Sequence, residues 1–534
     1  MEDLKTRKFL FSKIIIVPSL FFIFTLALGE SPFAQRRPRA TKTQPKLETR
    51  QKLIVAQETG PLTMDAHHVI DPATASIIEH MVEPLLELTP KGEIAPKLAE
   101  KWEVSADATE FTLRLKKGIK FHDGQPFNAE AVKVNFDRRL DFNAATKLYF
   151  LVAQIASVTV VNEYTVKINT KVPFAPLLSN LTYPTNGIQS PAALKRYWDK
   201  PLIMPIGTGP FIFKEWAPGN RLVMVRNDNY WGINPALSEV TFRVIPDDAS
   251  RVAALEKGEV HVAVKIPPSD LPRLKANSKI RIMTSPSART IYMGFNCLKE
   301  PFADKRIRQA LNYAVNKEAI VQHVLDGAGR VSDAPISPVI SGYVPIKAYA
   351  YSIEKAKALL TEAGFPEGFE TTLHSPSGRY YKDGSLATAV AAGLLKVGVK
   401  AEIKLMDWDT YIPFILRDHE EAEHRLYVLG WSTLTGDADY GLYPLFYSGE
   451  WPRKGTNASF FNNEELDQLL DTARSTANPN ERKKLYREAM SLIVEEAPWI
   501  FLYSEMEMTG VRANVKDIMV QPTEGVIVKQ ARIE

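Results

Sequence analysis

Strand-like and helix-like segments alternate along this chain from residue 51 onward. Short apolar segments at residues 51–57, 221–227 and 239–246 are typical of β-strands. Residues 304–327 and 352–364 have the apolar spacing of helices, and each of these segments ends at a glycine. This alternation predicts an α/β protein.

Further segments extend the same pattern. Residues 157–170 predict two strands joined by a turn at Asn162-Glu163. Helical spacing also occurs in residues 74–88, 462–474 and 480–499, and Pro498 ends the last of these segments.

Length and charge limit the class of protein. With 534 residues, the chain is too long for one ordinary hydrophobic core, so we expect two or three lobes. Hydrophobic residues make up 45% and charged residues 24%, which is typical of a globular protein and excludes a disordered chain. Residues 51–534 contain 56 Lys and Arg against 58 Asp and Glu. This nearly neutral body lacks the clustered cations that nucleic-acid binding requires.

The amino terminus has the pattern of an export signal. Four cationic residues precede an apolar run at residues 14–28, and small residues follow up to Ala34. We therefore predict a signal peptide over residues 1–34 and a polar, basic linker over residues 35–50. The apolar run is shorter than the ~20 residues of a membrane span, which favours cleavage, with an uncleaved anchor as the open alternative. No cysteine follows the run, so we expect a periplasmic or otherwise exported protein without a lipid anchor.

Residues 102–140 combine a local structural pattern with a specific motif. Apolar and polar side chains alternate over residues 109–115, and the alternation restarts over residues 119–121 after a turn, which predicts a hairpin. Asn128 then provides a helix N-cap, and apolar side chains line one helical face over residues 132–140.

This hairpin and helix resemble the signature of the extracellular solute-binding proteins, family 5, of ATP-driven importers. The resemblance covers nearly all of residues 51–534, through further motifs in the same order along the chain: residues 207–231, 242–260, 301–320, 351–369 and 486–503. It implies a ligand receptor rather than an enzyme. It also implies a two-lobed periplasmic-binding-protein (Venus-flytrap) fold of class II, with crossing strands between the lobes and an additional small subdomain inserted in the first lobe.

The family pattern also implies domain boundaries. The first lobe would comprise residues 51–79, 203–285 and 501–534. The inserted subdomain would take residues 80–202, and the second lobe residues 286–500.

Arg379 is the first candidate ligand-binding residue. In dipeptide-binding members, an arginine in a P-x-x-R segment anchors the ligand carboxylate, and residues 376–379 match that segment. A guanidinium suits this role because its planar fork donates two hydrogen bonds to one carboxylate. The peptide binders also have an amine-anchoring aspartate three residues after a Gly-Trp tryptophan, but Leu434 stands at that position here. A buried peptide ammonium would lack its partner there, so ordinary recognition of a peptide amino terminus is in doubt.

The loop over residues 430–446 is the second candidate region. It follows an apolar run, so it should emerge at the end of a strand, where ligands bind in α/β sheets. Asp437 and Asp439 lie in this loop, where they fit a ligand ammonium or, as the alternative, an acid/base pair. Together with residues 375–385 and 451–470, the loop resembles the glutathione-binding branch of the family.

The remaining candidates carry less specific signals. Trp408 and Trp431 suit either a pocket wall or the core, and Ser432 and Thr433 follow Trp431 in the same loop. The other four residues lie near the expected hinge or in a tight turn: Arg289, Tyr292, Thr208 and Gly209.

These observations predict the substrate-binding protein of an importer. It would capture a peptide-like solute, either glutathione or a short peptide, and deliver it to a permease powered by separate ATPase subunits. We expect a monomer without a cofactor, a metal site or a nucleic-acid partner. The alternatives are a secreted peptide hydrolase that uses Asp437 and Asp439, and a chaperone-like binding protein with the same fold.

Overall fold

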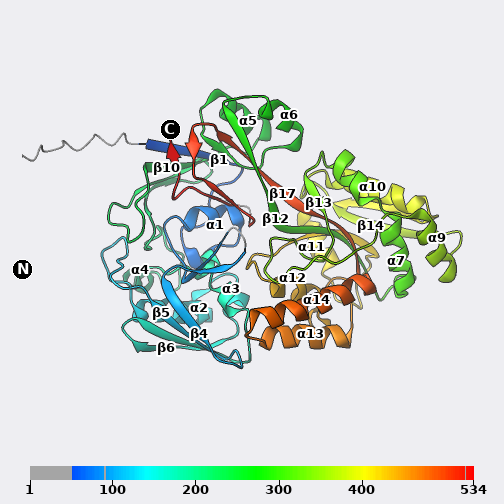
Figure 1. Cartoon of the computed structure of the whole chain (residues 1–534), viewed down its shortest axis with the longest axis horizontal. Helices are drawn as coiled ribbons and strands as arrows, with labels where there is room; N and C mark the ends of the chain where they lie inside the picture. Colours follow the sequence, from blue (N-terminus) through cyan, green and yellow to red (C-terminus); the bar gives the residue numbers. More distant parts are fainter. Residues whose placement is uncertain (1–50, 90–91, 524) are drawn as a thin grey trace, which may run out of the picture. The chain divides into compact units, whose positions relative to one another are not determined.

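Two long strands, β12 (Ile280–Phe295) and β17 (Trp499–Arg512), lie side by side at the centre of one large sheet (Figure 1). The computed structural model describes residues 51–534, apart from residues 90–91 and 524. In the described chain, ten strands of this sheet follow one another in the order β15 (Lys400–Met406), β14 (Glu370–Pro376), β16 (Leu426–Ser432), β12, β17, β11 (Val262–Ala263), β1 (Gln51–Gln57), β10 (Leu237–Val244), β9 (Arg221–Arg226) and β8 (Phe211–Ala217). An eleventh, β13 (Gly329–Val331), pairs with β17.

The antiparallel pair β12 and β17 connects the two halves of this sheet. Early β12 pairs with the end of β17, with Ile280 opposite Arg512, and β17 also pairs there with β11. The register between β12 and β17 shifts between Pro286 and Thr290. From Arg289 onward, β12 also pairs with β16 on its other side. We call β1, β8–β11 and the elements packed on them the first half, and β14–β16 and the elements packed on them the second half.

The first half combines parallel and antiparallel pairing. β1 is parallel to both β10 and β11, whereas β9 is antiparallel to β8 and β10. A separate antiparallel sheet has the order β4 (Ala99–Val104), β5 (Glu110–Leu115), β7 (Thr165–Thr170) and β6 (Ile155–Asn162). The helices of this half and of the four-stranded sheet are α1 (Pro72–Ile78), α2 (Ala129–Leu140), α3 (Leu177–Asn180), α4 (Pro191–Arg196), α5 (Asp248–Lys257) and α6 (Leu271–Lys275).

Short hairpins complete the first half. They are formed by β2 (Leu86–Leu88) with β3 (Ile94–Pro96) and by β19 (Met519–Gln521) with β20 (Gly525–Ile527). The antiparallel pair of β18 (Val515–Lys516) and β21 (Arg532–Ile533) encloses the second hairpin in the sequence. These carboxyl-terminal strands pack into the same apolar core as β1 and α1. The chain therefore returns to the first half after β17.

In the second half, helices cover both faces of the sheet. One core contains side chains of α7 (Lys305–Ala314), α9 (Ile353–Glu362) and α10 (Asp383–Leu395). The other contains side chains of α11 (Trp408–Ile415), α12 (Ala438–Phe446), α13 (Glu464–Ser475) and α14 (Pro479–Glu496). The short helix α8 (Lys317–Ala319) follows α7. This two-sided cover agrees with the parallel pairing of β14 with β15 and β16.

Most local predictions are confirmed. β5 forms within residues 109–115, and Asn128 caps α2 by accepting a hydrogen bond from the Ala131 N–H at 3.0 Å. The helix α9 forms within the predicted residues 352–364, and Gly364, just after its C-cap, has a positive φ of 88° that favours glycine.

Three local predictions are wrong. The single helix predicted over residues 304–327 is interrupted at Val315, which has an extended backbone, and continues as α8 and a π-helical segment at Ile320–Val324. Residues 119–121 form only an isolated bridge between Lys120 and Pro126, because β4 and β7 already occupy both edges of β5. The predicted helix at residues 74–88 ends at Ile78, and its later residues form a turn and β2. Pro84 lacks the N–H that a continuing helix would need.

The predicted signal peptide and linker lie outside the described residues. No helix among residues 51–534, as far as they are described, is long and apolar enough to span a membrane. The proposed lobe boundaries, including the inserted subdomain over residues 80–202, stay predictions.

Candidate functional site

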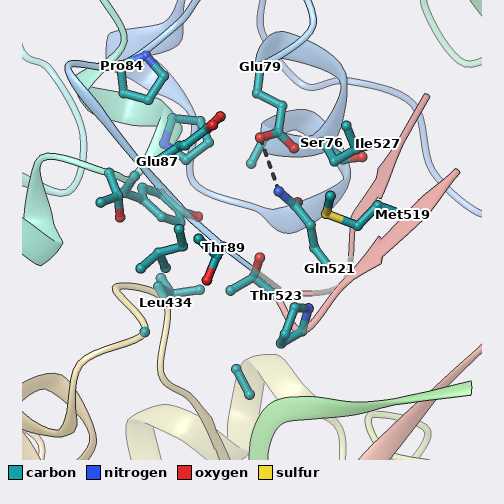
Figure 2. A pocket seen from close by; sticks show the side chains of 18 of the residues that line it. Ser76, Glu79, Pro84, Glu87, Thr89, Leu434, Met519, Gln521, Thr523 and Ile527 are labelled. Carbon is teal, nitrogen blue, oxygen red and sulfur yellow. Dashed lines mark hydrogen bonds between the residues drawn. The ribbon is translucent and has the colours of Figure 1, made fainter. Parts of the chain in front are cut away.

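A cavity of about 230 Å³ lies between the first and second halves (Figure 2). Three segments of the first half line it, namely residues 72–97, 182–184 and 519–530. The second half contributes five lining residues, which are Ala288, Val339, Ile340, Leu434 and Gly436. Ligand pockets for drug-sized molecules measure about 300–1,000 Å³. This cavity therefore suits a small solute or one end of a longer one.

Glu83 is a buried carboxylate of this cavity whose oxygens are fully engaged by the protein. One oxygen accepts hydrogen bonds from the Tyr230 hydroxyl at 2.7 Å and from the Lys97 ammonium at 3.1 Å. The other accepts from the Thr208 hydroxyl and the Trp231 indole, both at 2.8 Å. Four donors satisfy a buried carboxylate, so Glu83 holds the first half together rather than a ligand.

Lys97, Glu87 and Lys529 continue this network along the cavity wall. The Lys97 ammonium also lies 3.2 Å from Glu87, and Lys529 lies 3.2 Å from the same carboxylate oxygen. Burial alone would lower the pKa of Lys97, but the charges of Glu83, Tyr230 and Glu87 and the hydrogen bond to Glu83 together raise the pKa above its usual value. Lys97 therefore stays charged and paired.

Glu79 differs from these residues. Its Oε2 accepts one hydrogen bond, from the Gln521 amide at 3.2 Å (Figure 2). Its Oε1 is buried and has no hydrogen-bond partner among the residues that the structure describes. Burial raises the pKa of Glu79 to about 7, although Lys529, Gln521 and Lys97 act in the opposite direction. Glu79 is thus a carboxyl group with unused hydrogen-bonding capacity that faces the cavity.

The second half closes the cavity with an apolar wall. Leu434 faces the cavity from the loop after β16 (Figure 2), and Ala288, Val339 and Ile340 add aliphatic surface. Gly436 has a positive φ of 66°, and an added Cβ there would lie 2.6 Å from a Leu88 methyl group. Glycine therefore allows this loop to approach β2 closely. The loop predicted over residues 430–446 is confined to residues 433–437, because β16 extends to Ser432 and α12 begins at Ala438. Its residues Leu434 and Gly436 line the cavity.

Thr208 and Gly209 lie behind the cavity wall. The buried Thr208 orients Glu83 through its hydroxyl. The Gly209 N–H donates to the Met81 carbonyl at 3.0 Å, and an added Cβ would lie 2.5 Å from the His80 oxygen. This turn positions the acidic segment, and its Gly209 N–H is not available to a ligand.

Arg379 and Arg289 share a second pocket, of about 450 Å³, which is also lined by Lys265 and Glu505. The exposed Arg379 guanidinium lies 4.7 Å from the centre of the Trp408 ring, and it forms no ion pair with any described residue. Arg289 lies 3.5 Å from the Glu505 carboxylate. Ala288 lines the first cavity and its neighbour Arg289 lines the second pocket, so the two pockets are adjacent along β12.

Asp437 and Asp439 are both buried in ion pairs. Arg482 contacts both oxygens of Asp437, at 2.9 and 3.1 Å, and Arg474 contacts Asp439 at 2.9 Å. Asp437 also caps α12 and accepts a hydrogen bond from the Ser179 hydroxyl at 2.9 Å. Burial raises the pKa of Asp439. Burial would also raise the pKa of Asp437, but the charge and hydrogen bonds of Arg482, together with those from the Asp439 N–H and the Ser179 hydroxyl, lower it below its usual value. Both carboxylates have arginine partners, which gives no support to the hydrolase alternative.

The last four predicted residues lie in or beside the core of the second half. Tyr292 is fully buried and stacks on Trp499 with ring centres 3.4 Å apart, so it lines neither pocket. The half-buried Trp431 donates its indole N–H to the Tyr440 carbonyl at 2.8 Å. Ser432 pairs with Arg289 across the sheet, and the buried Thr433 donates its N–H to the Ala288 carbonyl at 3.2 Å. Ser432 and Thr433 thus flank the cavity wall without lining it.

Sequence reasoning missed the charged residues of the cavity. Glu79, Glu83 and Glu87 recur every four residues within an apolar segment, and this signal could have identified them. No local sequence pattern marks Lys529 as a cavity residue, because only the return of the chain after β17 brings it to Glu87. Within the described part of the chain, no group of three His, Cys, Asp or Glu residues is arranged to hold a metal ion.

The comparisons with known proteins agree with this arrangement. Residues 93–453 match the model of the bacterial extracellular solute-binding proteins, family 5 Middle. The glutathione-binding protein GsiB of Escherichia coli (strain K12) is 33% identical over 485 residues, which cover 90% of this chain and 94% of that protein.

Solved structures show the same fold. HbpA2 from Haemophilus parasuis superposes with a TM-score of 0.83 at 28% identity, covering 91% of this chain and 100% of that one. A dipeptide-binding protein from Pseudoalteromonas sp. SM9913 in complex with Met-Leu gives a TM-score of 0.74 at 27% identity, with the same coverage. These neighbours share the two-lobed fold, in agreement with the joining of two halves by β12 and β17. The chain therefore belongs to the bacterial extracellular solute-binding proteins of family 5.

Proposed function

We propose that this chain captures a short peptide-like solute in the cavity between its two halves, with glutathione as the specific candidate. The observation that carries this proposal is the cavity itself, because both halves line it. A ligand that contacts both halves stabilises the closed form only by as much as it binds that form better than the open one. The relatedness to a glutathione-binding protein over 90% of the chain supports the choice of candidate.

Delivery to a transporter follows from the family. Family 5 binding proteins work with the permease and ATPase subunits of ABC importers. We place this chain outside the cytoplasmic membrane as an exported monomer, which releases its solute to the permease. The buried, paired Asp437 and Asp439 favour this role over that of a hydrolase.

A co-purified ligand would test the proposal directly. We expect native mass spectrometry of freshly purified protein to show an added mass equal to that of glutathione, which disappears on denaturation. A short peptide of different mass would retain the binding function and reject glutathione. A metal chelate would reject a peptide-like ligand. Peptides cleaved during incubation would reject the receptor role.

Replacing Arg379 by alanine tests whether the ligand extends into the second pocket. The exposed guanidinium on Trp408 lacks an ion pair with any part of the chain that the structure describes, so it is available to a ligand carboxylate. We expect Arg379→Ala to weaken the binding of glutathione at least tenfold in calorimetry. Arg417→Ala, which removes an exposed arginine outside both pockets, should leave the affinity unchanged. Equal affinities for both variants would remove Arg379 from the site.

A further inference from the structure

We propose that Glu79 is the residue that binds the cationic group of the ligand, the primary ammonium of a peptide-like solute. This inference rests on the proposed function and names the chemistry by which the cavity selects its ligand. It assigns ammonium recognition to the first half, at the end of α1, and not to the loop after β16.

The pairing of charges singles out Glu79. Glu83 and Glu87 are balanced by Lys97 and Lys529, and contacts of 3.1–3.2 Å connect these four groups. Glu79 is the third glutamate that lines the cavity, beside two lysines. The cavity lining therefore has one surplus negative charge when Glu79 is ionised. A buried charge without a partner is costly, and a ligand ammonium would provide the missing partner.

The geometry of Glu79 also fits an ammonium. Its Oε2 is fixed by Gln521, which orients the carboxyl group, while the buried Oε1 has no hydrogen-bond partner in the described chain. An ammonium group has three donors and no acceptor, so it can satisfy Oε1 without disturbing Gln521. Figure 2 shows Glu79 and Gln521 on the same side of the cavity, with Leu434 across from them.

The apolar Leu434 strengthens the assignment. This residue stands where the resemblance to peptide binders places an amine-anchoring aspartate, and it lines the same cavity as Glu79. Asp437 and Asp439 do not replace that aspartate, because Arg482 and Arg474 occupy them. A carboxylate lost from one wall is thus replaced by a carboxylate on the opposite wall.

Ligand affinity should therefore depend on pH. The pKa of Glu79 near 7 results from burial, opposed by Lys529, Gln521 and Lys97 and reinforced by Glu87. The adjacent His80 is neutral, because burial lowers its pKa to about 4. Only ionised Glu79 attracts an ammonium, and its ionised fraction rises with pH. The affinity of the wild type for glutathione should rise about tenfold from pH 6 to pH 8.

The test compares Glu79→Gln with the wild type by calorimetry at pH 6 and pH 8. The probes are glutathione and the dipeptide Met-Leu, each with a free and with an acetylated amine. We expect Glu79→Gln to bind the free-amine probes at least tenfold more weakly at pH 8, and to lose the pH dependence. Acetylation should weaken binding strongly for the wild type but little for the variant. Glu100→Gln, an exposed change on β4, serves as the matched control.

The outcomes separate the two proposals. If the wild type binds a free-amine probe and Glu79→Gln binds it equally well, the assignment of Glu79 is overturned while the proposed function stands. A wild type that binds both acetylated probes as tightly as the free amines also overturns the assignment, without relying on the folding of any variant. A wild type that binds none of the probes overturns the proposed function together with this inference.

Discussion

Replacing Arg138 by methionine is expected to lower the free energy of unfolding by about 3–5 kcal/mol, because it leaves a buried carboxylate without its counterion. Arg138 and Asp65 are both fully buried, and the guanidinium contacts both carboxylate oxygens, at 3.2 and 2.8 Å. Arg138 also donates to the carbonyls of Trp198 at 3.0 Å and Lys200 at 2.9 Å. Helix α2 and the loop after α4 would lose these contacts together.

Urea unfolding followed by tryptophan fluorescence measures this loss. Arg114→Met provides a matched control, because Arg114 forms an exposed pair with Glu103, whose side chain is 71% exposed. Exposed pairs contribute little, so this variant should unfold at nearly the wild-type urea concentration. Equal midpoints for Arg138→Met and Arg114→Met would show that the buried pair adds no stability.

The same pair predicts a pH dependence. Burial would raise the pKa of Asp65, but the contact with His68 and the hydrogen bonds and charge of Arg138 hold it well below its usual value. The folded state thus has the lower pKa, and the stabilisation is fully present above the unfolded value of about 4. It is lost as the pH falls through the folded value. The difference between wild type and Arg138→Met should therefore be full at pH 7 and shrink below about pH 4.

Local sequence patterns predicted the elements that depend on local interactions. The strand β5 alternates apolar and polar residues, and α2 begins at an asparagine that caps it, so both could be located from their own residues. The prediction for the residues after Ile78 was wrong because the apolar spacing typical of a helix continues in the sequence past the end of α1. The prediction that residues 119–121 pair with β5 was wrong because β4 and β7 already occupy both edges of β5.

The candidate site was harder to predict than the fold because it is assembled over long distances. Glu79 meets Gln521 across 442 positions of sequence, and the meeting requires the return of the chain through β17. The P-x-x-R segment pointed to Arg379, but only the structure shows that it lies in a different pocket from Leu434. Asp437 and Asp439 looked available in sequence because their partners, Arg482 and Arg474, lie 45 and 35 positions away.

Arg482→Met is expected to lower the free energy of unfolding of the second half by about 3–5 kcal/mol. The change leaves the buried Asp437 without the guanidinium that contacts both of its oxygens, at 2.9 and 3.1 Å. It also removes the donor to the Tyr486 hydroxyl at 2.7 Å. Burial would raise the pKa of Asp437, but the contacts with Arg482, the Asp439 N–H and Ser179 together lower it, so this stability is present above about pH 4 and lost at lower pH.

Arg487→Met is the matched control for this prediction, since Arg487 is an exposed arginine of the same helix, α14. Ser179→Ala separates folding from closure. Ser179 lies in α3, which belongs to the first half, and its hydroxyl donates to Asp437 of the second half at 2.9 Å. If that contact forms on closure, Ser179→Ala should weaken glutathione binding about tenfold, with a smaller loss of stability than Arg482→Met. Arg482→Met and Arg487→Met unfolding at the same urea concentration would mean that the ion pair at Asp437 contributes nothing to stability.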